Sequence, residues 1–311
     1  MFYRLDPFQV ALGYNSMFTQ LVQTPAGADA VYLGKTLNKA HQRYYETVYY
    51  FLRWADAGAN APETVRGIQQ VNKMHKAAWS RAPGAGHFAW EAQMAIIVLS
   101  YFEDFVRKTV GASCAPVPPQ VREAWPLWSA QLTQHFATED GAVLPNFGVN
   151  YPRTWAEVEA FYWWWEEYPF EKSATDEQKL RAYEVSQAFQ SQFSELFFPA
   201  GFGWLGGQVF KTFVPPKCRE RTRLGHPNPV MERIIKFGVW AQISIQDLLP
   251  DSKVAPMAKL YEDMQSHKSF RDIDASIQQS RKSLLYNMFL TTGLFFVVIS
   301  VVFFKYFGGR L

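Results

Sequence analysis

Residues 41–79, HQRYYETVYYFLRWADAGANAPETVRGIQQVNKMHKAAW, predict a pair of helices and with it the fold class. The first helix is expected over Lys39–Ala57, and Gly58 then begins a loop. The second is expected to begin near Pro62, because a proline early in a helix followed by the acidic Glu63 is typical of a helix start. Since the loop is short, the two helices should be antiparallel neighbours.

One histidine lies on the apolar face of the second predicted helix. Ile68, Val71 and His75 are spaced by three and four residues and therefore share a face. Arg43 and Thr47 share a face of the first helix for the same reason. A histidine in this position is usually a core residue with a hydrogen-bond partner. The alternative is an axial ligand to a metal or a haem iron, because neutral imidazole is a common metal ligand. Spacing alone leaves both interpretations open.

Two stretches of the pair, RYYETVYYFL at 43–52 and RGIQQVNKMH at 66–75, resemble the MpaB and latex-clearing protein (rubber oxygenase) family. That family is all-helical and binds haem b, and some members cleave isoprenoid double bonds with dioxygen. The resemblance implies that His75 is the proximal iron ligand and that Arg43 and Thr47 serve haem binding and catalysis. Latex-clearing members carry a distal lysine beside the threonine. This chain has Glu46 there, which makes Glu46 a candidate general base.

Composition sets limits on the class of protein. A chain of 311 residues has room for one large domain or two small ones. With 17% aromatic and 19% charged residues it is not expected to be disordered. A net charge of +3, with no basic run interleaved with aromatics, argues against a nucleic-acid partner. Cys114 and Cys218 match no CxxC pattern, so a zinc site or disulfide framework is not expected and a reducing compartment fits.

Further helical runs predict an all-α domain over residues 1–255. They are expected at 88–110, 117–137, 151–168, 175–198 and 230–249, and no run shows the alternation of a strand. Thr154 with Glu157, and Thr175 with Gln178, are expected as helix caps. Within 88–110 the predicted core residues are Met94, Ile97, Val98, Tyr101, Phe102 and Phe105. Glu103, Asp104 and Arg107 shorten its uncharged run, which favours a buried helix over a membrane span.

The segment 199–231 is rich in glycine and proline. GFGWLGG lacks the GK[ST] of a phosphate-binding loop, so its glycines are expected to allow close approach of other groups. The basic residues of FVPPKCRERTRLGHPNP are interpreted as a solvated loop. The alternative is a basic rim for haem propionates or anionic lipid headgroups.

The end of the chain predicts a membrane anchor. Residues 283–304 carry no charge and are long enough to span a bilayer as a helix. We therefore expect a transmembrane helix at 283–306, joined to the domain by a polar helix at 256–282. Basic residues flank both sides, so the orientation stays open. Membrane lipid is the expected surrounding, in the endoplasmic reticulum or the mitochondrial inner membrane.

Two functions follow from these observations. The first is a membrane-anchored, haem-dependent oxygenase acting on an isoprenoid or lipid-like substrate. The second is a non-catalytic accessory subunit of a membrane complex, such as a mitochondrial respiratory complex, that has kept the oxygenase fold. The missing distal lysine and the tryptophan-rich stretch at 163–165 favour the second, whereas Arg43, Thr47 and His75 favour the first.

Overall fold

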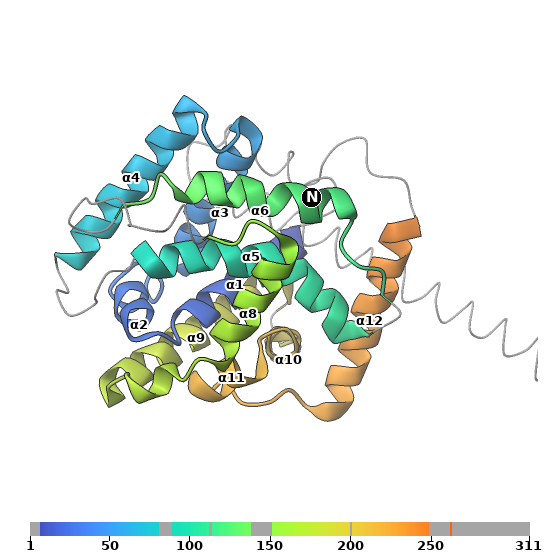
Figure 1. Cartoon of the computed structure of the whole chain (residues 1–311). Coiled ribbons are helices and arrows are strands. Elements are labelled where there is room, and N and C mark those ends of the chain that lie inside the picture. The colour runs from blue at the N-terminus through green and yellow to red at the C-terminus, as the bar shows by residue number, and fades with distance from the viewer. Residues whose placement is uncertain are drawn as a thin grey trace, which may run out of the picture. The chain divides into compact units, whose positions relative to one another are not determined.

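The computed structural model describes residues 7–80, 89–111, 114–137, 151–199, 201–248 and 262. The chain divides into two units, Met1–Glu262 and Asp263–Leu311, and all described residues belong to the first. Its helices are α1 (Pro7–Leu21), α2 (Pro25–Tyr32), α3 (Ala40–Ala57), α4 (Pro62–Trp79), α5 (Ala89–Val110), α6 (Pro119–Thr133), α8 (Trp155–Glu167), the 3₁₀ helix η2 (Phe170–Lys172), α9 (Asp176–Phe197), α10 (Gly203–Thr212), α11 (Pro216–Arg221) and α12 (Pro229–Leu248). The predicted all-α class is confirmed for this unit (Figure 1).

Helix α1 is the central element of the unit. It packs against α3, α5 and α9, and every residue from Ala11 to Leu21 is buried. A helix enclosed on all sides is normally apolar throughout, yet this run contains several polar side chains. Two of them form hydrogen bonds with the backbone: Thr19 Oγ1 donates to the Asn15 carbonyl at 2.8 Å, and Ser16 Oγ donates to the Phe213 carbonyl at 3.1 Å. The central helix thus ties the first residues of the domain to its last third.

The α3–α4 pair forms as predicted. Trp54 of α3 and Ile68 of α4 belong to one buried apolar cluster, which Ile96 of α5 and Phe136 join from other parts of the chain. Gly67 allows the close approach of the two helices, because a Cβ atom there would lie 2.8 Å from the indole nitrogen of Trp54. The helix pair is therefore one wall of the domain.

The other predicted helices and caps are confirmed. Thr154 and Thr175 each form a capping box, with Glu157 and Gln178. The predicted core residues of α5 are all buried: Met94, Ile97, Val98, Tyr101, Phe102 and Phe105. Trp165 is buried in α8, whereas Trp163 and Trp164 remain exposed.

The prediction of a solvated loop for the basic segment is wrong for Arg219 and Arg221, whereas Lys217 and Arg223 are exposed as expected. α11 runs through the segment, and Arg219 is buried with its Nη1 donating to the Lys211 carbonyl at 2.6 Å. Arg221 pairs with Glu171 and also donates to the Glu166 carbonyl. Because the guanidinium groups bind this domain itself, they do not form the alternative basic rim.

The glycine-rich stretch forms α10, which the sequence analysis did not predict. A Cβ atom on Gly206 would lie 2.8 Å from Cα of Ser194 in α9. The expected close approach is therefore confirmed at this glycine.

The predicted polar helix at 256–282 and the transmembrane helix at 283–306 lie outside the described residues. Within the described part of the chain, no helix combines the length and the apolar character that crossing a bilayer requires.

Candidate functional site

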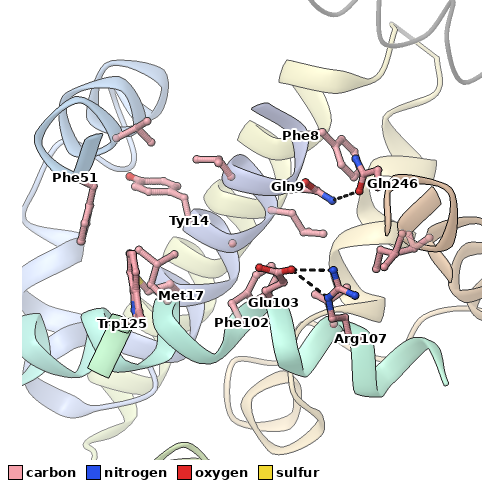
Figure 2. Close-up of a pocket in the computed structure, with 18 of the residues that line it drawn as sticks. Phe8, Gln9, Tyr14, Met17, Phe51, Phe102, Glu103, Arg107, Trp125 and Gln246 are labelled. Atoms are coloured by element: carbon pink, nitrogen blue, oxygen red, sulfur yellow. Dashed lines mark hydrogen bonds and ion pairs between the residues drawn. The ribbon is translucent and has the colours of Figure 1, made fainter. Parts of the chain in front are cut away.

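An apolar cavity of about 120 Å³ lies between α1, α3, α5, α6 and α12. Most of its lining is aromatic or aliphatic. Figure 2 shows Tyr14, Met17, Phe51 and Trp125 toward one end of the cavity. Tyr14 and Met17 are fully buried members of the central helix. A cavity with such walls suits an apolar chain or ring, because it removes hydrocarbon surface from water.

The other end of the cavity is polar. We call Glu103, Arg107 and Asp247 the carboxylate cluster. Arg107 Nη1 donates to Asp247 Oδ2 at 2.7 Å and Nη2 to Oδ1 at 3.1 Å, so α5 is joined to α12 by a bidentate ion pair. Arg107 Nε also donates to Glu103 Oε1 at 3.1 Å (Figure 2). Beside the cluster, Gln9 Nε2 donates to Gln246 Oε1 at 3.3 Å.

The carboxylate cluster is only partly shielded from water. Arg107 is 6% exposed, while the side chains of Glu103 and Asp247 are 18% and 21% exposed. Burial opposes the charge on Arg107, but its two carboxylate partners outweigh burial and raise the pKa of the guanidinium. The carboxylate cluster itself thus combines two carboxylates with one guanidinium.

A second group of polar side chains is connected through Arg43, which lies near both His75 and the Tyr14 phenol. We call Tyr14, Arg43, Thr47 and His75 the imidazole cluster. Burial lowers the pKa of His75 to about 4, and the neighbouring Arg43 guanidinium lowers it as well. Burial raises the pKa of Tyr14 to about 12, against the opposing effects of Arg43 and Thr47 beside its phenol. At neutral pH both rings are therefore uncharged, and Arg43 is the cation between them.

The Arg43 guanidinium also contacts residues outside the imidazole cluster. Its Cζ lies 4.6 Å from the centroid of the Phe18 ring, a cation–π contact with α1. Gly34 leaves room for the guanidinium, because a Cβ atom at this glycine would lie 2.9 Å from Arg43 Nη1. The position of Arg43 thus depends on residues from two other segments of the chain.

Glu46 is bound by residues outside this cluster. Its two carboxylate oxygens accept hydrogen bonds from Lys35 Nζ at 2.7 and 2.8 Å. Gln42 Nε2 donates to the same carboxylate at 2.8 Å, although the charge of Glu46 also contributes to the raised pKa of Tyr14. The structure therefore places Arg43 near His75 and, with Thr47, beside Tyr14, whereas Glu46 pairs with a surface lysine.

Tyr14 belongs to both regions. It lines the apolar cavity and contributes its phenol to the imidazole cluster, whereas Arg43, Thr47, Glu46 and His75 do not line that cavity. The sequence analysis missed Tyr14, which lies in a helix it did not predict. It also treated Glu103 and Arg107 only as charges that shorten an apolar run. Their spacing of four residues inside that run was the available signal for a buried ion pair.

The side chains around His75 fit the chemistry of haem b, the group that the family resemblance implies. A neutral imidazole is the form that ligates iron, and burial keeps His75 neutral. Arg43 supplies a cation suited to a propionate. No cluster of three or more histidine, cysteine or acidic residues that could hold another metal ion occurs among the described residues.

Comparison with protein-family models gave no match for this chain, and comparison with curated proteins gave none either. The resemblance to the MpaB and rubber-oxygenase family therefore stays a prediction from the two helical stretches.

Proposed function

We propose that this chain is a membrane-anchored, haem-dependent oxygenase-like protein that acts on an isoprenoid or other lipid-like substrate. The observation that supports it is the position of Tyr14, which is shared by the apolar cavity and the imidazole cluster. A hydrocarbon chain in the cavity would reach the phenol that borders Arg43, Thr47 and His75. The anchor at 283–306 would keep the domain at a membrane, where such substrates dissolve.

Each side chain has a defined part in this proposal. His75 would ligate the iron and Arg43 would pair with a propionate. Haem, when bound, supplies activation of dioxygen. Thr47 and Tyr14 would position the substrate by hydrogen bonds, and Tyr14 remains protonated because burial raises its pKa to about 12. The apolar walls exclude water. Glu46 would have to leave Lys35 before it could accept a proton, so no step is assigned to it.

A visible absorption spectrum of the full chain, purified with haem supplied during expression, tests this proposal. The expected result is a Soret band that shifts on reduction and is lost in His75→Ala. His226→Ala is the matched control, because His226 is exposed in the segment between α11 and α12 and should keep the band. Folded protein without a Soret band, or a band that survives His75→Ala, would contradict the proposed ligand.

The exposed face of α12 favours the second candidate, an accessory subunit of a membrane protein complex. Val230, Ile234, Phe237, Ile245 and Leu248 are exposed, and their spacing places them on one face of the helix. An apolar face of this kind marks an interaction surface. If the chain is such a subunit, it will migrate in native gels of solubilised membranes within a larger complex. Phe237→Glu would then release it, whereas the exposed Leu180→Glu on α9 would not.

A further inference from the structure

We infer that the apolar cavity selects a single-chain amphiphile with an uncharged, hydrogen-bonding head group, such as an alcohol, and rejects carboxylate and phosphate head groups. This deepens the proposed function, because it names the substrate class of the same cavity. It concerns binding alone, so it can be tested whether or not haem is present.

The hydrogen bonds that Arg107 already makes exclude an anionic head group. Arg107 would be the natural partner of a carboxylate or phosphate, but its donors are already used. Nη1 and Nη2 of Arg107 donate to Asp247, and Nε donates to Glu103. Nη1 also donates to the Ala115 carbonyl at 2.8 Å. An incoming anion would have to displace Asp247 and leave both native carboxylates beside it. Like charges at such a partly buried site repel strongly.

The neighbouring amides supply partners for a neutral head group. The bond from Gln9 Nε2 to Gln246 Oε1 is long, at 3.3 Å, and it joins α1 to α12 across the polar end of the cavity. A hydroxyl group both donates and accepts, so it can insert between the two amides and bond to each. Neither amide carries charge, and a hydroxyl group can therefore enter without breaking an ion pair.

The two ends of the cavity differ in solvent exposure, and this difference determines the orientation of the bound amphiphile. Asp247 and Glu103 at the polar end are partly exposed, whereas Tyr14 and Met17 at the opposite end are buried. The head group therefore lies at the Gln9–Gln246 end, and the hydrocarbon chain extends toward Tyr14 (Figure 2). This orientation directs the chain, and not the head group, toward the imidazole cluster.

The test compares dodecanol with dodecanoate, two ligands with the same chain length, for binding to the detergent-solubilised full chain at pH 7.4 by calorimetry. Dodecanol is expected to bind at least about tenfold more tightly, equivalent to ~1.4 kcal/mol. Glu103→Gln removes one of the two carboxylates bound to Arg107, so it should narrow this ratio several-fold. Glu171→Gln is the matched control, because Glu171 pairs with Arg221 away from the cavity lining and should leave the ratio unchanged.

A second variant keeps the test valid if Glu103→Gln does not fold. Gln246→Leu removes one head-group partner without changing charge, so it should weaken dodecanol binding several-fold and leave the affinity for dodecane unchanged. Equal affinities for dodecanol and dodecanoate, or an unaltered ratio in folded Glu103→Gln, would overturn the inference. So would failure of both ligands to bind. Selective dodecanol binding by protein that shows no Soret band would support the inference while the oxygenase proposal fails.

Discussion

Two arginine-centred clusters, one at the polar end of the cavity and one beside the Tyr14 phenol, differ in how their charge is balanced. In the carboxylate cluster, Arg107 is bound by two carboxylates and joins α5 to α12. In the imidazole cluster, Arg43 lies beside neutral rings, and the carboxylate of Glu46 on the same helix is paired with Lys35. The first arrangement suits cross-linking of helices, whereas the second leaves a cation available for an anionic group of a cofactor.

The largest effect is expected from removing the cation of the carboxylate cluster. Arg107→Met would leave Glu103 and Asp247 close together without a counter-charge. Removing one partner of a buried ion pair costs about 3–5 kcal/mol, and the partial exposure of these carboxylates favours the lower limit, about 3 kcal/mol. Urea unfolding measures the loss. Lys236→Met, which removes an exposed pair with Glu232, should cost about 0.5 kcal/mol or less. Equal losses in the two variants would refute the cross-linking role.

The imidazole cluster should respond to pH instead. Because the pKa of His75 falls from its usual 6.5 to about 4 on folding, the unfolded chain takes up a proton first as the pH is lowered. This contribution to stability is complete above pH 6.5 and is lost between about 6.5 and 4. At pH 4.5 we expect a loss of about 2 kcal/mol, allowing for partial exposure of the ring.

Comparison with His75→Gln isolates this contribution. The difference in unfolding free energy between the native chain and the variant should change by about 2 kcal/mol between pH 7 and pH 4.5, because all other titrations are common to both. A difference that is constant with pH would show that His75 titrates at its ordinary value. The imidazole cluster would then be open to water, unlike the proposed haem pocket.

A smaller effect is expected where the cavity meets the imidazole cluster. Tyr14→Phe removes the phenol beside Arg43 and Thr47 but keeps the ring in the cavity wall. Because Tyr14 Oη is buried and makes no hydrogen bond with any described residue, its removal should raise the unfolding free energy by about 1 kcal/mol. Tyr168→Phe, at an exposed position, is the control and should have no effect. A loss of stability in Tyr14→Phe would instead show that the phenol is hydrogen-bonded within the fold, and it would then not be available to bind a substrate.

Local signals in the sequence were sufficient for most of the fold. Caps at Thr154 and Thr175, and the Pro62 start of α4, act within one helical turn, so their spacing alone predicted the element. The periodicity of α5 predicted its core for the same reason. Helix α1 was missed because it is buried on every side, and its polar residues hide the apolar pattern that a one-sided helix shows.

The site could be predicted only in part, because half of it depends on distant pairs. The spacing of Arg43 and Thr47, together with the resemblance, indicated three residues that the structure places together. The partner of Arg107 lies 140 positions further along the chain, and no local pattern connects Asp247 with it. Glu46 is the converse case: its position beside Thr47 suggested chemistry, but the partner that occupies its carboxylate, Lys35, comes from the segment before α3.

The smallest effect is expected at Glu46. Lys35 and Glu46 are 47% and 33% exposed, so their ion pair contributes about 0.5 kcal/mol or less, and Glu46→Gln should hardly change the unfolding free energy. Turnover with a long-chain alkene alcohol should also be unaffected, because the carboxylate is directed at Lys35 and not at the imidazole cluster. A general base, in contrast, would lower turnover about 10²–10⁴-fold when neutralised. A loss of that size in folded Glu46→Gln protein would mean that Glu46 exchanges Lys35 for the substrate during the reaction. The imidazole cluster would then include a carboxylate, as the carboxylate cluster around Arg107 already does, and this difference between the two clusters would disappear during the reaction.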